Sequence, residues 1–257
     1  MRRDGRPRRP VVRPARAPGA AAPAARHGLA RILSKRGLCS RSEAERWIAA
    51  GRVSVAGRIV RDPERPTAAD AAIAIDGETA AAPARLYLML NKPRGLVTSV
   101  RDEQGRDTVY RCFDGAGLPW LAPVGRLDKA SEGLLLFSND PAWAARITEG
   151  GPDKVYHVQV DGHPDPQVLA RLVEGVDVAD ARLRAKTVRL LRSGEKNAWL
   201  EVVLDEGRNR HIRRLLEAFD FGVLRLVRVR IGALELGDLP GGGWRHLSES
   251  EAAGLAG

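Results

Sequence analysis

The 257-residue sequence contains little cysteine and no long apolar run. Its two cysteines, Cys39 and Cys112, lie far apart without Cys-x-x-Cys spacing, which argues against a disulfide framework or a zinc ribbon. Such cysteine usage is typical of a reducing compartment, so we expect a cytoplasmic protein. No apolar stretch approaches the roughly 20 residues that a membrane-spanning helix needs, and we expect no membrane partner.

Motifs for metal ions and nucleotides are also missing from the sequence. Neither a GxxxxGK[ST] loop nor a strand-linked GxGxxG occurs. The five histidines are scattered without the spacing of metal ligands: His27, His157, His163, His211 and His246. The sequence therefore predicts that no metal and no cofactor is bound.

Positive charge is present in excess but is unevenly distributed. The chain has 42 Lys and Arg against 32 Asp and Glu, a formal net charge of +10. Residues 1–26 carry +7, residues 27–62 carry +5 and residues 63–257 carry −2. The last range still holds one basic island, Gly207–Arg230, with seven arginines and two acids. A basic excess indicates a polyanionic partner, and this distribution indicates where the partner binds.

Residues 1–26 are predicted to form a disordered basic arm. They combine eight Arg with five Pro and seven Ala, so they have no face to bury and no continuous helix. The apolar core of a signal peptide is missing. The prolines also interrupt the amphipathic helix of a mitochondrial presequence, whose Arg-rich composition the arm shares.

Residues 27–83 are predicted to form a small basic domain followed by a linker. Apolar spacing at Leu29, Ile32 and Leu33 predicts one helix, and the Ser40–Glu43 capping pattern predicts the start of a second. A glycine-turn hairpin is expected at 53–60. Any one basic side chain here fits an ordinary solvated surface, but together they concentrate potential suited to phosphates. The candidate RNA-binding residues are Arg31, Lys35, Arg36, Arg41, Arg46, Arg52 and Arg58.

Residues 84–257 form the second predicted domain, and its most informative segment surrounds Asp128. A polar, glycine-bounded loop that carries Asp128 precedes the apolar run Leu134–Phe137, which predicts a buried strand. Catalytic groups often occupy loops held by a rigid sheet. From the residues alone, the pattern favours an ordinary turn or capping role for Asp128 over a catalytic one.

Most of the remaining segments of this domain are predicted to form strands. Residues 155–160 alternate, which places Tyr156 on one face as a core residue or a site residue. Gly207 precedes a helix whose apolar stripe leaves Arg210 and Arg213 off the core face. Few crossover helices separate the strands, so we expect an α+β fold with a mixed, largely antiparallel sheet.

Three motifs in this order resemble one enzyme family. GRLDKASEGLLLFSND, KVYHVQV and EGRNRHIRRLLEAFDFGVLRLVRVRIG follow a module that resembles the S4-type RNA-binding domain. The combination resembles the RsuA/RluB family of ribosomal-RNA pseudouridine synthases, and the EGRNR form is closest to the large-subunit members. The resemblance runs from about Leu29 to the final helix, and the KPxG motif at Lys92–Gly95 supports it.

The resemblance implies roles for individual residues. Asp128 would be the catalytic carboxylate, attacking ribose C1′ or removing a ribose proton, with Arg213 as its basic partner and Tyr156 beside the uracil. Substrate-binding roles would fall to Arg126, Leu226, Arg210 and Lys92. For Arg126 a loop salt bridge is an alternative, and for Leu226 a plain core position. The partner would be ribosomal RNA or a partly assembled ribosomal subunit, bound by a monomer.

Two other functions are compatible with the sequence. One is a non-catalytic, S4-type assembly factor that binds RNA or the ribosome, for which Asp128 would have no use. The other is an RNA-directed glycosidase, because Glu132 lies four residues after Asp128 and glycosidases use paired carboxylates.

Deleting residues 1–26 should weaken RNA binding without changing which uridine is modified. The arm offers eight arginines to phosphates, and phosphate contacts carry no sequence information. Titrations of the full and shortened chains at several salt concentrations should show a smaller salt dependence for the shortened chain. A changed modification site would contradict this expectation.

Overall fold

The computed structural model describes residues 26–100, 102, 104–178 and 181–257. The predicted basic arm, apart from its last residue, lies outside the described residues. In the described ranges, no helix has the length and apolar character needed to cross a bilayer.

The N-terminal unit packs two helices against short strands. Ser40 begins the second helix, because its Oγ accepts a hydrogen bond from the Glu43 amide at 3.1 Å, as predicted. The turn between β2 and β3 places Ala56 and Gly57 at positive φ, the geometry of a tight hairpin. The elements are β1 (His27–Gly28), α1 (Leu29–Lys35), α2 (Arg41–Ala49), β2 (Val53–Val55), β3 (Arg58–Ile59), β4 (Pro66–Thr67), β5 (Ile73–Ile75) and β6 (Glu78–Thr79).

The C-terminal unit is built on one large sheet with the strand order β13-β14-β10-β15-β9-β7-β17. Within the described ranges its strand pairs are antiparallel except for β15 with β9, which confirms the predicted α+β fold. Its elements are β7 (Tyr87–Lys92), η1 (Val109–Phe113), β8 (Ala122–Val124), β9 (Glu132–Ser138), α3 (Pro141–Thr148), β10 (Lys154–Asp161), α4 (Pro166–Glu174), β11 (Val176–Val178), β12 (Ala181–Leu183), β13 (Thr187–Ser193), β14 (Asn197–Leu204), α5 (His211–Glu217), β15 (Val223–Ile231), β16 (Leu234–Glu235), β17 (Trp244–His246) and α6 (Glu249–Ala256).

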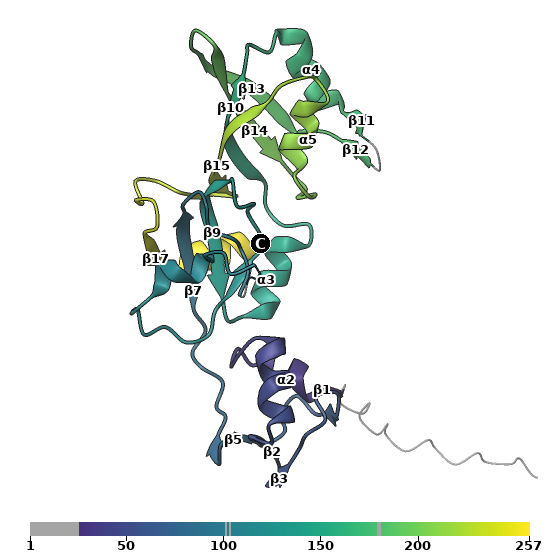
Figure 1. Ribbon diagram of the computed structural model, residues 1–257, viewed down its shortest axis with the longest axis vertical. Coiled ribbons are helices and arrows are strands. Elements are labelled where there is room, and N and C mark those ends of the chain that lie inside the picture. Colours follow the sequence, from purple (N-terminus) through teal and green to yellow (C-terminus); the bar gives the residue numbers. More distant parts are fainter. Residues whose placement is uncertain (1–25, 101, 103, 179–180) are drawn as a thin grey trace, which may run out of the picture.

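Around β9, both faces of this sheet are covered by apolar packing. Alternate residues of β9 belong to different cores, because Leu135 and Phe137 face the core shared with α4 and α5 while Leu134 and Leu136 face α3 and α6. Strands buried on both faces become continuously apolar, which explains the run predicted at 134–137. Figure 1 shows α4 and α5 beside β10 and β14, with α3 near β9.

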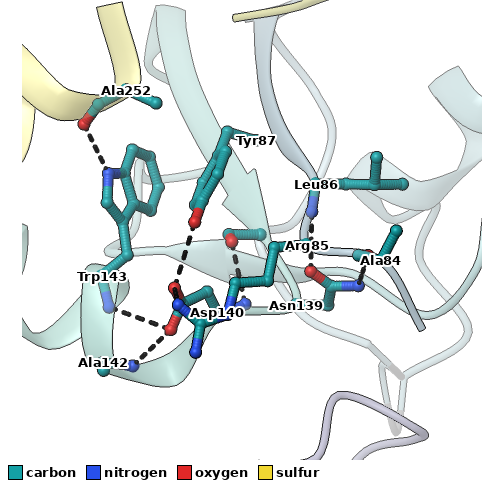
Figure 2. A network of polar contacts seen from close by, with 10 residues as sticks. Ala84, Arg85, Leu86, Tyr87, Asn139, Asp140, Ala142, Trp143 and Ala252 are labelled. Atoms are coloured by element: carbon teal, nitrogen blue, oxygen red, sulfur yellow. Dashed lines mark hydrogen bonds and ion pairs between the residues drawn. The ribbon is translucent and has the colours of Figure 1, made fainter. Parts of the chain in front are cut away.

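A polar joint connects the linker to the β9–α3 turn (Figure 2). The buried side chain of Asn139 accepts from the Leu86 amide at 2.9 Å and donates to the Ala84 carbonyl at 2.8 Å. Asp140 caps α3, accepts from the Tyr87 hydroxyl at 3.1 Å and pairs with Arg85. Since the last strand of the small unit ends at Thr79 and Ala84 is already bound here, these contacts support the proposed boundary near residue 83.

Gly133 and Gly95 provide a matched test of the β9–β15 pairing. Both have φ +100°, but an added Cβ at Gly133 would lie 2.8 Å from Arg228 N and closer still to its carbonyl oxygen, whereas at Gly95 it would meet nothing within 4 Å. We expect Gly95→Ala to lower the free energy of unfolding by about 1–2 kcal/mol through backbone strain. Gly133→Ala should lower it by about 2 kcal/mol more, because the strands must separate. Equal losses in urea denaturation would contradict this.

Candidate active site

A cavity of about 240 Å³ opens where the loop between β8 and β9 meets α5 and the ends of β10 and β15. Residues from the Gly125–Asp128 segment form one wall and residues 207–213 form another, while Ile147 and Thr148 of α3 close a third side. Pockets for drug-sized ligands run from about 300 to 1,000 Å³, so this cavity suits a smaller group such as one nucleoside.

Asp128 reaches this cavity from a loop that is anchored by its backbone. The buried Leu127 carbonyl accepts from the Thr98 hydroxyl at 2.8 Å, and the Asp128 carbonyl accepts from the Ser131 amide at 2.9 Å. Gly95 N donates to the Lys129 carbonyl at 2.8 Å. These contacts fix the main chain on both sides of Asp128, so its half-buried carboxylate is held at the cavity wall.

Lys92 lies beneath this loop and is fully buried, although the sequence predicted a substrate contact. Its Nζ donates to the carbonyls of Pro93 at 3.1 Å, Asp128 at 3.2 Å and Ser131 at 2.8 Å. Burial lowers the pKa of Lys92 to about 8, while the nearby Asp128 and Glu132 carboxylates act in the opposite direction. Because its three donors are occupied and its side chain does not line the cavity, we propose that Lys92 positions the loop instead of touching substrate.

Arg213 extends from α5 to the far side of the same loop. Its Nη1 donates to the Val223 carbonyl at 3.1 Å and its Nη2 to the Ala130 carbonyl at 3.3 Å. Among the described residues no ion pair within 4.0 Å joins it to Asp128, and its two carbonyl contacts bridge the loop to β15. Burial, and then the charge of Arg210, lowers the pKa of Arg213, and Asp128 opposes this shift.

The cavity floor is formed by neighbouring strands. Tyr156 on β10 pairs with Arg228 on β15, and Val158 pairs with Leu226, so Tyr156 and Leu226 lie close together. Both are almost completely buried, with exposed fractions of 8% and 6%, and both line the cavity. An aromatic ring and a leucine side chain on one floor form a surface on which a flat ring can pack.

Arg126 and Arg210 are exposed at the cavity and line it as well. The salt bridge considered for Arg126 is not found among the described residues. Arg210 adopts φ +49° and ψ +33°, a left-handed conformation, immediately before α5. Such strain in a non-glycine residue is often associated with functional sites.

Asp128 is the one carboxylate among the described residues that line the cavity. The basic lining residues are Arg126, Lys154, Arg208, Arg210, Arg213 and Arg228. Glu132, the second acid that a glycosidase would need, lies outside the lining and is held by Arg225 at 2.9 Å. The cavity therefore offers one carboxylate in a strongly positive field.

Sequence reasoning did not identify several lining residues, among them Lys154, Arg228 and His211. In the described chain, the buried side-chain nitrogens without a hydrogen-bond partner are His211 Nδ1, Arg213 Nε and Arg228 Nη2, and all three residues line this cavity. Buried polar atoms without a hydrogen-bond partner are rare in proteins. Their gathering around one cavity marks it as the place where a ligand binds. Within the described ranges, no group of three His, Cys, Asp or Glu side chains is placed to hold a metal ion.

The basic residues of the small unit differ in their contacts. Arg36 is half-buried, and its Nη2 donates to the Ala69 and Ala71 carbonyls, so it ties α1 to the segment before β5. Arg41, Arg46 and Arg52 form exposed ion pairs with acids of the same unit. Arg31, Lys35 and Arg58 are also exposed. Exposed ion pairs are weak, so these arginines can exchange partners for phosphates.

Comparison with known proteins matches both units. Residues 86–218 match the RNA pseudouridylate synthase family model, and residues 28–67 match the S4 domain model. The chain is 36% identical over 235 residues to an uncharacterized RNA pseudouridine synthase of Aquifex aeolicus, covering 88% of this chain and 92% of that protein. It is 38% identical over 250 residues to ribosomal large subunit pseudouridine synthase B of Haemophilus influenzae, covering 93% and 68%. A crystal structure of a pseudouridylate synthase superposes with a TM-score of 0.62 at 28% identity, covering 90% of this chain and 100% of that one.

The lowered pKa of Lys92 predicts a pH-dependent stability. In the native state Lys92 loses its proton near pH 8, but in the unfolded chain near its usual 10.5, so the unfolded state binds more protons between these values. The free energy of unfolding of the wild type should therefore rise relative to Lys92→Met from about pH 8 to 10.5.

Urea denaturation of both chains at several pH values measures this difference. Lys129→Met removes an exposed lysine from the same loop and serves as the control, with no such relative change expected. A difference between wild type and Lys92→Met that stays constant from pH 7 to 10 would contradict the prediction.

Proposed function

The chain belongs to the RNA pseudouridylate synthase family, whose members isomerise uridine, and we propose that it modifies a uridine of large-subunit ribosomal RNA with Asp128 as the catalytic carboxylate. The observation that carries this proposal is the single carboxylate of the cavity, held by an anchored loop and surrounded by basic side chains.

The choice of RNA rests on the relatives and on the N-terminal domain. Two relatives at 38% identity, from Haemophilus influenzae and Pasteurella multocida, are named ribosomal large subunit pseudouridine synthase B. The S4 domain match and the exposed basic residues of the small unit support an RNA substrate. The substrate would be ribosomal RNA, either free or in a partly assembled subunit.

The reaction needs one carboxylate and no external reagent. The C1′–N1 bond breaks and its electron pair stays on uracil, while Asp128 either bonds to C1′ or takes a ribose proton. The base then turns and C5 bonds to C1′, while the Asp128–C1′ bond breaks in the first route or the ribose proton returns to the sugar in the second. The C5 proton finally leaves and N1 gains a proton. Atoms and electrons balance within the nucleotide, so an isomerase needs only Asp128 and a site that holds the base in place.

The other lining residues have roles that follow from their positions. Tyr156 and Leu226 would pack against the flipped base, since they form the buried floor. Arg126 and Arg210, exposed at the cavity, would bind the flanking phosphates. Arg213 and Lys92 would hold the loop through the carbonyls of Ala130, Asp128 and Ser131.

We also propose that the enzyme acts in the cytoplasm as a monomer. Cys39 and Cys112 are free, and burial raises the pKa of both thiols, which keeps them protonated and unreactive.

Asp128→Asn should abolish isomerisation and leave RNA affinity within several-fold, because phosphate contacts supply most of the binding. We expect the rate to fall by at least about 10³-fold, as it does when an essential catalytic group is lost. Release of tritium from C5-labelled uridine in ribosomal RNA measures the rate. Asp165→Asn is the matched control, since Asn also caps a helix and Asp165 caps the distant α4. Full turnover by Asp128→Asn would disprove the assignment.

The target can be found by mapping pseudouridines in ribosomal RNA from cells with and without this gene. One site should disappear from the large-subunit RNA and return when the wild-type gene, but not the Asp128→Asn gene, is restored. Loss of a small-subunit site would contradict the subunit assignment alone. An unchanged map would contradict the proposed substrate.

A further inference from the structure

Arg228 is the most deeply buried arginine that lines the cavity, with an exposed fraction of 5%. Its Nε donates to the Leu134 carbonyl at 2.7 Å, which fixes the guanidinium against β9. Its Nη2 is buried and has no hydrogen-bond partner among the described residues. A buried donor without a partner destabilises the fold unless a ligand supplies an acceptor.

Lys154 adds a second positive charge to the same floor. It lies two residues before Tyr156 on β10, and therefore on the same face of the sheet. Its Nζ forms no hydrogen bond or ion pair with a described residue. Lys154 and Arg228 line the same cavity, where their like charges repel. Burial, followed by the charge of Arg228, lowers the pKa of Lys154, while the Asp153 and Asp205 carboxylates oppose this shift. An electron-rich group between them would relieve this repulsion.

The position of Arg228 favours a base over a phosphate as that group. Arg228 pairs in register with Tyr156, on which the flipped base would pack. A phosphate would stay hydrated at the exposed Arg126 and Arg210, whereas it would lose its water at the buried Arg228. Uracil presents two carbonyl oxygens at its edge, O2 and O4, whereas cytosine keeps O2 but carries an amino donor at position 4 that a guanidinium cannot bind.

We propose that Arg228 Nη2 donates a hydrogen bond to a carbonyl oxygen of the flipped uracil, O2 or O4, beside the positive charge of Lys154. This inference rests on the proposed function and assigns the uracil-recognition subsite within that cavity. When the C1′–N1 bond breaks, the electron pair left on uracil spreads onto both carbonyl oxygens. The hydrogen bond is then stronger in the transition state than in the bound substrate, so Arg228 acts on the rate as well as on binding.

Arg228→Gln should lower the single-turnover rate of tritium release by roughly 10²-fold, the effect of removing one preorganised donor to a developing negative charge. RNA affinity should change less than threefold. Arg230→Gln, on the same strand but outside the cavity lining, is the matched control and should keep both values within threefold. A rate for Arg228→Gln within threefold of the wild type, or equal losses of rate and affinity, would overturn the proposal.

Substrate analogues keep the test independent of how well the variant folds. Ribosomal RNA transcripts would carry 2-thiouridine or 4-thiouridine at the mapped site, since sulfur accepts hydrogen bonds weakly. We expect one analogue to slow the wild type at least tenfold and to slow Arg228→Gln much less, which identifies the contacted oxygen. Uridine-like rates for both analogues in the wild type, or equal slowing of the two proteins, would overturn the proposal.

The two proposals fail in different ways. If the wild type releases no tritium from ribosomal RNA, the proposed function fails. If the wild type is active and Arg228→Gln matches it, only the subsite assignment fails.

Discussion

The short parallel pairing of β9 with β15 is the contact on which the rest of the site depends. It consists of Val227 opposite Glu132 and Arg228 opposite Gly133, and it joins the β13-β14-β10-β15 half of the sheet to the β9-β7-β17 half. Gly133 has no side chain and therefore allows the Arg228 backbone to approach closely. The Asp128 loop enters the sheet at this seam, directly beside the strand that provides Leu226 and Arg228. A cavity assembled from both halves of the sheet can form only where they meet.

Near the β9–β15 pairing, some charged side chains are paired within the protein and others are not. Glu132 is held by Arg225 and lies outside the cavity lining, so Asp128 is the one carboxylate among the described lining residues. Lys92 satisfies its own charge with three carbonyls beneath the loop, and Arg213 does the same with two carbonyls beside it. These two cations therefore stabilise the position of Asp128 through the backbone. Arg228 and Lys154 keep unpaired donors instead, which leaves their charge available to a ligand.

Local sequence patterns predicted the elements and only part of the site. The Ser40 cap, the buried run 134–137 and the α+β class follow from short-range patterns, and the structure contains all three. The motifs also named Asp128, Tyr156 and Leu226 as site residues, and all three line one cavity. The resemblance implied a substrate contact for Lys92, but tertiary packing buries its side chain beneath the loop.

Arg228 could not be recognised in the same way. Its strand alternates arginines with apolar residues, a pattern that suits a half-exposed surface. A register shift between Val155 and Tyr156 places Arg230 opposite Val155 and Arg228 opposite Tyr156, so a bulge in β15 decides which arginine faces the cavity. No local pattern encodes that shift. Tertiary structure also distributes the charge of the basic island at 207–230, with Arg228 in the buried floor, Arg213 against the loop and Arg208 and Arg210 at the exposed rim. A segment that looks uniformly basic in sequence is divided by the fold into arginines that hold the Asp128 loop and arginines that leave their charge free in the cavity.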